Sequence, residues 1–190
     1  LGINITCVGK GKIFNLINSK NENTYADKIC ERVLKQNYTY KKNSFLKRGS
    51  NERQFGCQNL NLPFVTICRD IFGKYDEYHT SDDNLSIINE SNLKQTSKLL
   101  YKIIKEAEKN DIFIKKKMCE PFLSKYNLIY NVSTNKNMKS KIKKKILDLV
   151  SYVDKNNDLF ELSQKLSINY NQAKKIASQL VNLKIINKVI

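Results

Sequence analysis

A short apolar run, Pro63 to Cys68, lies between two groups of polar and ionisable residues, and it constrains the fold more than any other stretch. Its length and composition predict a buried strand. Gly73 marks a turn after it, and the loop that follows carries Glu77-Tyr-His-Thr-Ser-x-Asp83, with the only histidine of the chain. Open α/β sheets keep their sites at the carboxyl ends of their strands. We therefore expect an α/β sheet with a site in this loop.

Other segments supply further strands and helices. Residues 2–8 and 13–17 alternate and are β-rich, which predicts two strands, or a strand with its return. Residues 24–36 and 89–108 place apolar residues at helical spacing; Asn23-Thr24 and Ser91 are the expected caps. A short strand is expected at 38–40 and a polar loop at 41–49. A helix should begin at Glu52, where the backbone N–H groups suit an anion or carboxylate.

The carboxyl-terminal third has a different pattern. Amphipathic segments at 142–153, 159–166 and 173–183 precede a β segment at 185–190, with a tight turn at Ser167-Ile168-Asn169. This order is typical of a winged helix-turn-helix domain. We expect an α/β domain over 1–110, a connector over 111–137 with short strands near 112–114 and 128–129, and a winged-helix domain over 138–190. The outer side of the third helix carries Asn171, Gln172, Lys174, Lys175 and Gln179.

The five cysteines are odd in number and widely spaced, without a C-x-x-C pair. That excludes a disulfide framework and a zinc knuckle as first interpretations, and reduced thiols in a cytoplasm fit best. Cys7 and Cys68 lie in apolar runs and are expected to be core residues. No apolar run approaches the roughly 18 residues of a membrane span, so we expect a soluble, cytoplasmic protein without a membrane partner.

The net charge of +16 comes almost entirely from lysine, and no arginine follows Arg69. Lysine lacks the planar fork that reads guanine edges, so this excess supports loose phosphate contact at most. For the winged helix we therefore rank DNA binding below protein docking or dimerisation, which leaves a homo-oligomer open.

Several motifs together resemble the zinc-dependent aminopeptidases with two co-catalytic metals, and in particular the bacterial aminopeptidase-like proteins of polysaccharide biosynthesis clusters, whose chains end in a winged-helix domain. The motifs are Ile5-Thr-Cys-Val-Gly9, Thr24-Tyr-Ala-Asp27, Gly49-Ser-Asn-Glu-Arg-Gln-Phe55, Leu62-Pro63, Glu77-Tyr-His-Thr-Ser81, Cys119-Glu-Pro121 and the terminal three helices. The resemblance implies the carboxyl-terminal part of such a protein: a truncated α/β sheet domain with flanking helices, followed by a small winged helix. The opening Leu1-Gly2-Ile3, which looks like the inside of a strand, fits that expectation.

The resemblance also implies roles for residues. His79 would be the final zinc ligand, and Asp83 would support it. Glu52 and Arg53 would face the pocket. From their chemistry we infer that the arginine holds a substrate carboxylate and the glutamate an amino terminus, and we add Tyr78 as a substrate-binding residue. One or two zinc ions would be the cofactor of the intact protein, and a peptide or small amide its substrate.

The chain departs from the family pattern in two places: Asn51 stands where an aspartate is usual, and Lys10 and Gly11 stand where an acidic pair is usual. A cation at a metal site opposes metal binding. A two-metal hydrolase also needs several ligands and a general base, which one histidine cannot supply. We expect no catalytic residue in this chain, weak zinc binding and no peptidase activity of the chain alone.

The leading hypothesis is thus the carboxyl-terminal portion of a zinc aminopeptidase-like hydrolase, which cleaves peptide or amide bonds next to a free amine. Two alternatives stay open. One is a DNA-binding or regulatory winged-helix protein, and the other is a metal-free relative that serves as an assembly module.

Overall fold

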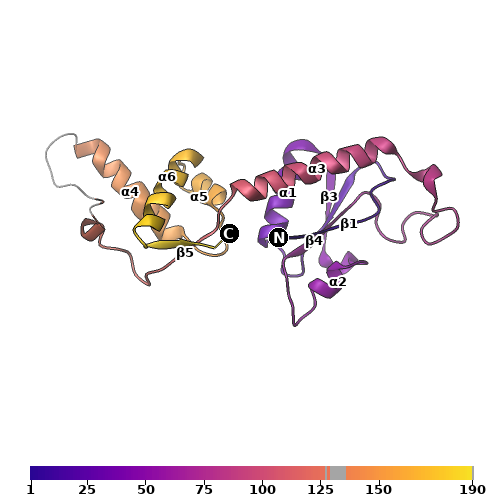
Figure 1. The fold of residues 1–190 in the computed structure, drawn as a ribbon, viewed down its shortest axis with the longest axis horizontal. Coiled ribbons are helices and arrows are strands. Elements are labelled where there is room, and N and C mark those ends of the chain that lie inside the picture. Colours follow the sequence, from indigo (N-terminus) through magenta and orange to yellow (C-terminus); the bar gives the residue numbers. More distant parts are fainter. Residues whose placement is uncertain (127, 129–135, 190) are drawn as a thin grey trace. The chain divides into compact units, whose positions relative to one another are not determined.

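The computed structural model of the protein describes residues 1–126, 128 and 136–189. The chain forms two compact units, Leu1–Glu108 and Lys109–Ile190. The first is a mixed α/β unit, and the second contains three helices and a two-stranded sheet (Figure 1). The expected fold class is confirmed.

The first unit holds the larger sheet. In chain order its elements are β1 (Gly2–Ile5), β2 (Phe14–Ile17), α1 (Tyr25–Asn37), β3 (Tyr40–Asn43), a 3₁₀ helix (Phe45–Lys47), α2 (Glu52–Phe55), β4 (Phe64–Cys68), a 3₁₀ helix (Leu85–Ile87) and α3 (Glu90–Lys109). The strand order is β1-β4-β2-β3. β1 runs parallel to β4, and β2 runs antiparallel to β4 and parallel to β3. The first two strands are therefore not a hairpin, because β4 lies between them.

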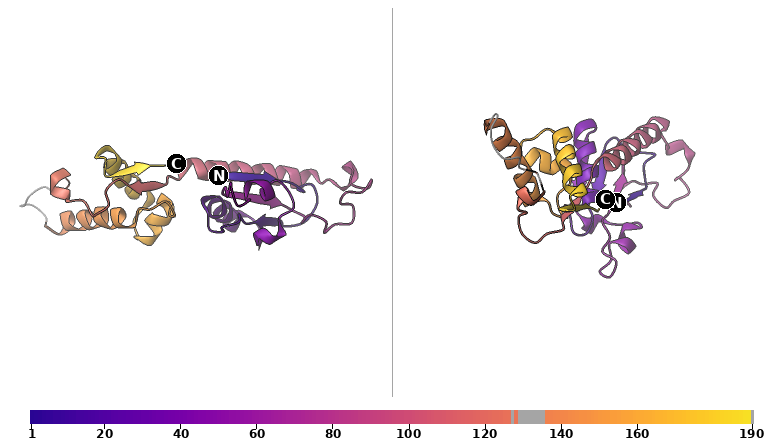
Figure 2. Two further views of the ribbon diagram at one scale, coloured as in Figure 1. Left: turned by 90° about the horizontal axis from the view of Figure 1, so that it is seen from below. Right: turned by 60° about the vertical axis from the view of Figure 1, so that its left-hand side comes forward.

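The two faces of this sheet differ in chemistry, because side chains alternate between the faces along each strand. On one face, Phe14, Leu16, Val65 and Ile67 pack against α1 and α3 in a buried core. Two further views show α3 running along the sheet (Figure 2). The other face buries polar residues, namely Asn4, Asn15, Asn43 and Thr66, and is contacted by α2.

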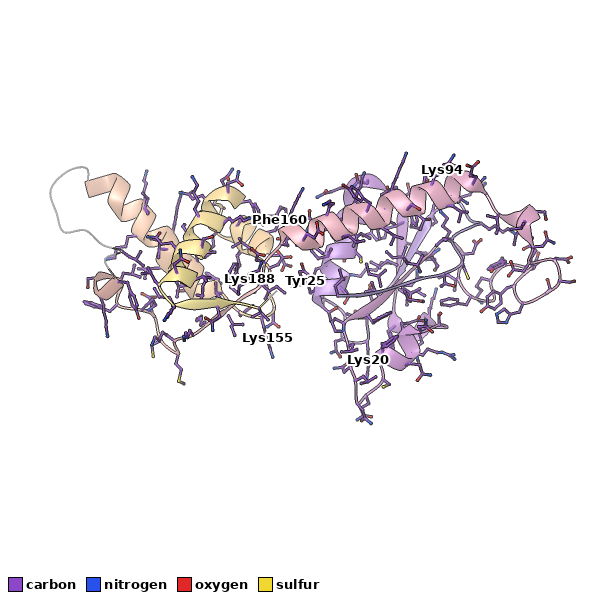
Figure 3. The ribbon with its side chains drawn as sticks, viewed as in Figure 1. Lys20, Tyr25, Lys94, Lys155, Phe160 and Lys188 are labelled. Carbon is purple, nitrogen blue, oxygen red and sulfur yellow. The ribbon has the colours of Figure 1, made fainter. Side chains whose placement is uncertain are left out.

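The helices of the first unit follow their apolar spacing. All the expected stripe residues of α1 are buried: Ala26, Ile29, Cys30, Val33 and Leu34. The α1 start is closed as a capping box, in which Asp27 accepts the N–H of Thr24 at 3.0 Å. At the start of α3 the expected cap is wrong by two residues, because Asn89 Oδ1 accepts the N–H of Ser91 at 2.8 Å. Tyr25, labelled in Figure 3, joins the two helices by donating its hydroxyl to Ala107 O at 3.1 Å.

The second unit has the winged-helix order of elements. They are β5 (Phe113–Lys115), a 3₁₀ helix (Leu123–Tyr126), α4 (Lys136–Tyr152), α5 (Leu159–Lys165), α6 (Tyr170–Asn182) and β6 (Ile186–Lys188). β5 and β6 pair antiparallel. Ser167, in the predicted turn between α5 and α6, has φ 52°, and Asn169 caps α6 by accepting the N–H of Asn171. These features complete the helix-turn-helix that the spacing predicts.

The range expected as a connector, 111–137, contributes directly to this second unit. Phe113 and Leu123 are buried in the same core as the helices α4 to α6. β5 supplies half of the small sheet, and α4 already begins at Lys136. Leu128, from the second expected strand, packs partly buried against this core, and Ile129 lies outside the described residues. Across the described ranges, none of the helices has the length and apolar content of a membrane span.

Candidate functional site

A cavity of about 760 Å³ lies at the carboxyl ends of β1 and β4. Because these neighbours are parallel, the loops that follow them meet at one edge of the sheet. The loop after β1 contributes residues 6–10, the segment 49–54 contributes most of its residues, and the loop after β4 contributes residues between 70 and 83. Four of the expected site residues line this cavity: Arg53, Tyr78, His79 and Asp83. The fifth, Glu52, does not.

His79 is exposed and has an unusual backbone conformation, with φ 60°. That region costs a residue with a side chain about 1 kcal/mol or more unless its surroundings hold it. The Tyr78 ring stacks on the imidazole, with centroids 4.0 Å apart and an interplanar angle of 13°. Tyr75 meets Tyr78 edge-on at 5.4 Å and donates its hydroxyl to Cys7 Sγ at 3.7 Å. A chain of aromatic contacts thus connects the end of β1 to the histidine.

Asp83 lines the same cavity as His79, but it is exposed, and its backbone N–H bonds Thr80 O at 3.2 Å. Among the described residues, no hydrogen bond joins its carboxylate to the imidazole. The supporting role that the resemblance implies for Asp83 therefore stays a prediction.

Glu52 is fully buried beneath the cavity wall, on the polar face of the sheet. Its carboxylate accepts hydrogen bonds from Gly49 N (2.6 Å), Ser50 N (3.0 Å), Thr66 Oγ1 (2.8 Å) and Asn4 Nδ2 (3.2 Å). Burial alone raises the pKa of this carboxyl, but these donors outweigh it and the net pKa lies below its ordinary value. Glu52 was expected to face the substrate, and the backbone N–H groups near it were expected to be free for an anion. Instead, the Glu52 carboxylate itself accepts the N–H groups of Gly49 and Ser50.

Arg53, the next residue, is exposed at the cavity. Its only side-chain hydrogen bond in the described part of the chain runs from Nε to Ser50 O at 3.4 Å. The terminal nitrogens of its guanidinium are therefore available for a carboxylate, which arginine binds with two parallel N–H bonds. The helical turn of α2 separates the two neighbours: Glu52 points inward and Arg53 faces the cavity.

Lys10 and Glu77 form an ion pair at this cavity that the sequence did not predict. Lys10 Nζ lies 2.7 Å from Oε1 and 2.6 Å from Oε2 of Glu77. This hydrogen bond raises the pKa of Lys10 and lowers the pKa of Glu77. Asp70 also lines the cavity. Its Oδ2 is buried and has no hydrogen-bond partner among the residues that the structure describes, and burial raises the pKa of this carboxyl. The parallel alignment of β1 with β4 would have predicted that these loops meet.

The expectation that Cys7 and Cys68 are both core residues is met by Cys68 alone. Cys68 is buried in the sheet, and burial raises the pKa of its thiol to about 12, as expected for a core residue. Cys7 is only partly buried, lines the cavity and has φ 47°, so it is not a core residue.

The donor set of the cavity does not by itself fit a zinc ion. Nowhere among residues 1–126, 128 and 136–189 do three or more His, Cys, Asp and Glu side chains come together in a way that could hold a metal. Glu77, the carboxylate nearest in sequence to His79, is occupied on both oxygens by the ammonium of Lys10. His79 could supply one ligand, and a complete site would need others from outside this sequence.

Comparison with known families agrees with the two units. Residues 1–111 match the family described as "Domain of unknown function (DUF4910)". The chain belongs to this family. Residues 111–188 match the family described as "winged helix-turn-helix", and this range includes β5.

Two relatives come from Clostridium acetobutylicum. One is provisionally named a polysaccharide biosynthesis protein with an aminopeptidase-like domain; it is 36% identical over 127 residues, which are 66% of this chain and 29% of the relative. The other is a crystal structure that is provisionally described as that of a peptidase. It is 28% identical to this chain, with a TM-score of 0.59, and the match covers 99% of this chain and 42% of that one. The chain thus spans less than half the length of either relative.

Proposed function

We propose that this chain forms one wall of the substrate cavity of an aminopeptidase-like hydrolase, which cleaves a peptide or amide bond next to a free amine. The observation that supports this most is the meeting of His79 and Arg53 in one cavity at the carboxyl ends of two parallel strands. The names of the two relatives point to the same class of protein.

In this proposal Arg53 binds a carboxylate of the substrate, and the stacked ring pair of Tyr78 and His79 forms the adjoining surface. Glu52 does not touch the substrate. It holds the N–H groups of Gly49 and Ser50 and so sets the path of the segment from which Arg53 extends.

For zinc, we propose that His79 is the single ligand that this chain contributes. Zinc in hydrolases polarises a carbonyl and lowers the pKa of bound water. Since the residues that the structure describes hold no group of three or more His, Cys, Asp and Glu side chains for a metal, we expect weak zinc binding and no peptidase activity from these 190 residues alone.

A dipeptide with a free carboxylate and the same dipeptide amidated at its carboxyl end test the role of Arg53. The chain has a single histidine, so its imidazole Hε1 signal in an NMR spectrum reads binding directly at His79. We expect the free acid to bind about tenfold more tightly, equivalent to about 1.4 kcal/mol. Arg53→Gln should abolish this difference.

The control is Arg48→Gln. Arg48 is also exposed in the first unit, but it stacks on Phe45 at 5.1 Å and does not line the cavity. If neither dipeptide moves the His79 signal, or if Arg48→Gln has the same effect as Arg53→Gln, the proposed substrate site is wrong.

A second candidate function concerns the winged helix. Helix α6 buries Ala173, Ile176, Ala177 and Leu180 and leaves a polar groove on its outer side. The groove is lined by Asn171, Lys174, Lys175, Ser178, Gln179 and Asn182. This face could contact the phosphates of DNA.

Retention of the whole chain on DNA at increasing salt tests this second candidate. A phosphate-driven contact should weaken steeply with salt and weaken further in Lys174→Gln/Lys175→Gln. Lys155→Gln/Lys116→Gln removes the same charge from exposed positions of the same unit; Lys155 is labelled in Figure 3. Equal loss in both variants would reject α6 as the contact.

A further inference from the structure

We infer that Lys10 is a positioning residue, which holds His79 at the cavity through its ion pair with Glu77. Lys10 lies in the loop after β1, and Glu77 precedes His79 by two residues in the loop after β4. The ammonium bonds both carboxylate oxygens, at 2.6 and 2.7 Å, although 67 positions separate the two residues. This inference rests on the proposed role of the cavity.

The His79 loop needs such an anchor. Between β4 and α3 the chain has one 3₁₀ helix, Leu85–Ile87, and otherwise turns. His79 itself has φ 60°, which only a well-held loop maintains. The Lys10 ammonium also lies 5.8 Å from the centroid of the Tyr75 ring, at the base of the aromatic chain that ends on the imidazole.

The base from which Lys10 extends is itself fixed. Asn92, on the first turn of α3, donates its side-chain amide to Gly9 O (3.2 Å) and Gly11 O (3.1 Å), on either side of Lys10. The backbone N–H of Asn89 also bonds Gly9 O at 2.8 Å. Since α3 packs into the apolar core, the backbone on either side of Lys10 is held by a rigid element.

The ion pair should matter more for local geometry than for global stability. The Lys10 and Glu77 side chains are 41% and 23% exposed, and ion pairs of this kind contribute little to unfolding free energy. An effect on His79 without an effect on stability is therefore the signature of positioning, and a purely structural role would not produce it.

The imidazole NMR signal of His79, recorded at one fixed pH on the whole chain, tests the inference. In Lys10→Gln the signal should move toward its position in the urea-unfolded protein, while the thermal midpoint stays the same. Lys10→Arg should restore the signal. Lys12→Gln is the matched control, because Lys12 is exposed in the same loop and does not line the cavity.

A His79 signal that is unchanged in Lys10→Gln, or equally changed in Lys12→Gln, would overturn the inference. If Lys10→Gln fails to fold, two other variants test the inference. Glu77→Gln should shift the His79 signal, and the exchanged pair Lys10→Glu/Glu77→Lys should return it to its wild-type position. Any other result rejects the ion pair as the anchor. Failure of the proposed function would look different, because the dipeptides would leave the wild-type His79 signal unmoved whatever the Lys10 variants do.

Discussion

The two faces of the four-stranded sheet are built by different forces. One face buries Leu16, Val65 and Ile67 under α1 and α3, where contacts are apolar and non-directional. The opposite face buries Asn4, Thr66 and other polar groups, whose hydrogen bonds have defined partners and directions.

This difference separates stability from site geometry. Burial of apolar area stabilises the unit but leaves the loops free, whereas the hydrogen bonds of Glu52 connect the sheet directly to Gly49 and Ser50 at the cavity. We therefore expect substitutions on the apolar face to change the free energy of unfolding most, and loss of the Glu52 carboxylate on the polar face to change the cavity as well.

The largest effect on stability is expected for Leu99→Ala, on the apolar face. Leu99 is fully buried between α3 and the sheet, so the change removes apolar contacts and leaves a cavity. The free energy of unfolding of the first unit should fall by about 2–5 kcal/mol. Equilibrium urea unfolding measures it, with Leu46→Ala, at a side chain 83% exposed, as the neutral control. The imidazole signal of the folded protein should not change; if it does, the two faces are not separable.

Glu52→Gln should have the next largest effect. The amide has one acceptor oxygen where the carboxylate has two, and its NH₂ group would point at buried donors. We expect a loss of about 2–3 kcal/mol together with a weaker preference for the free-acid dipeptide, since the Arg53 segment loses its anchor. Unchanged dipeptide binding would show that the polar face does not set the cavity.

The pH dependence of stability gives a further test of Glu52. Its folded pKa lies below the unfolded value of about 4.3, so its contribution is present above that pH and is lost as the pH falls through the folded pKa. Urea midpoints should therefore decrease over this acidic window, and less steeply in Glu52→Gln. Some slope should remain, because the pKa values of Glu31 and Glu77 are also lowered. Equal slopes in both proteins would contradict the placement of Glu52.

The smallest effect is expected for Thr66→Val. The valine has nearly the same shape but removes the hydroxyl that donates to Glu52 at 2.8 Å, which leaves three donors to the carboxylate. Stability should fall by about 1 kcal/mol, and dipeptide binding should stay as in the wild type. A loss as large as that of Glu52→Gln would mean that the hydroxyl, and not the backbone N–H groups, holds the carboxylate.

Local pattern was enough to predict most elements. Apolar spacing gave α1, α3 and the three helices of the second unit, because burying a stripe is a requirement that each helix carries in its own sequence. The capping residue of α3 was missed because Asn89 and Ser91 both suit a helix start, and only the backbone path selects between them. β5 was placed in a connector because its partner, β6, lies at the far end of the chain.

The arrangement of the candidate site was harder to predict, because it depends on partners that are far apart in the sequence. The Tyr-His-Thr-Ser loop and Arg53 could be picked out because their motif is local. The direction of Glu52 could not, since one step along α2 turns a side chain from the cavity to the sheet, where Asn4 and Thr66 bind it. From the sequence, Lys10 was interpreted only as a positive charge near a metal site. Its pairing with Glu77 follows from the alignment of β1 with β4, which brings their two loops together.

The sequence by itself determined which segments are helices, that a strand leads to the single histidine, and that a winged helix ends the chain. Only the tertiary structure decided that β4 lies between the first two strands, that Glu52 is buried, and that Lys10 bonds the loop of His79. The reason is physical: secondary structure follows from contacts between near neighbours in the chain, whereas the geometry of a site depends on contacts between residues far apart in sequence, which form only when strands pair.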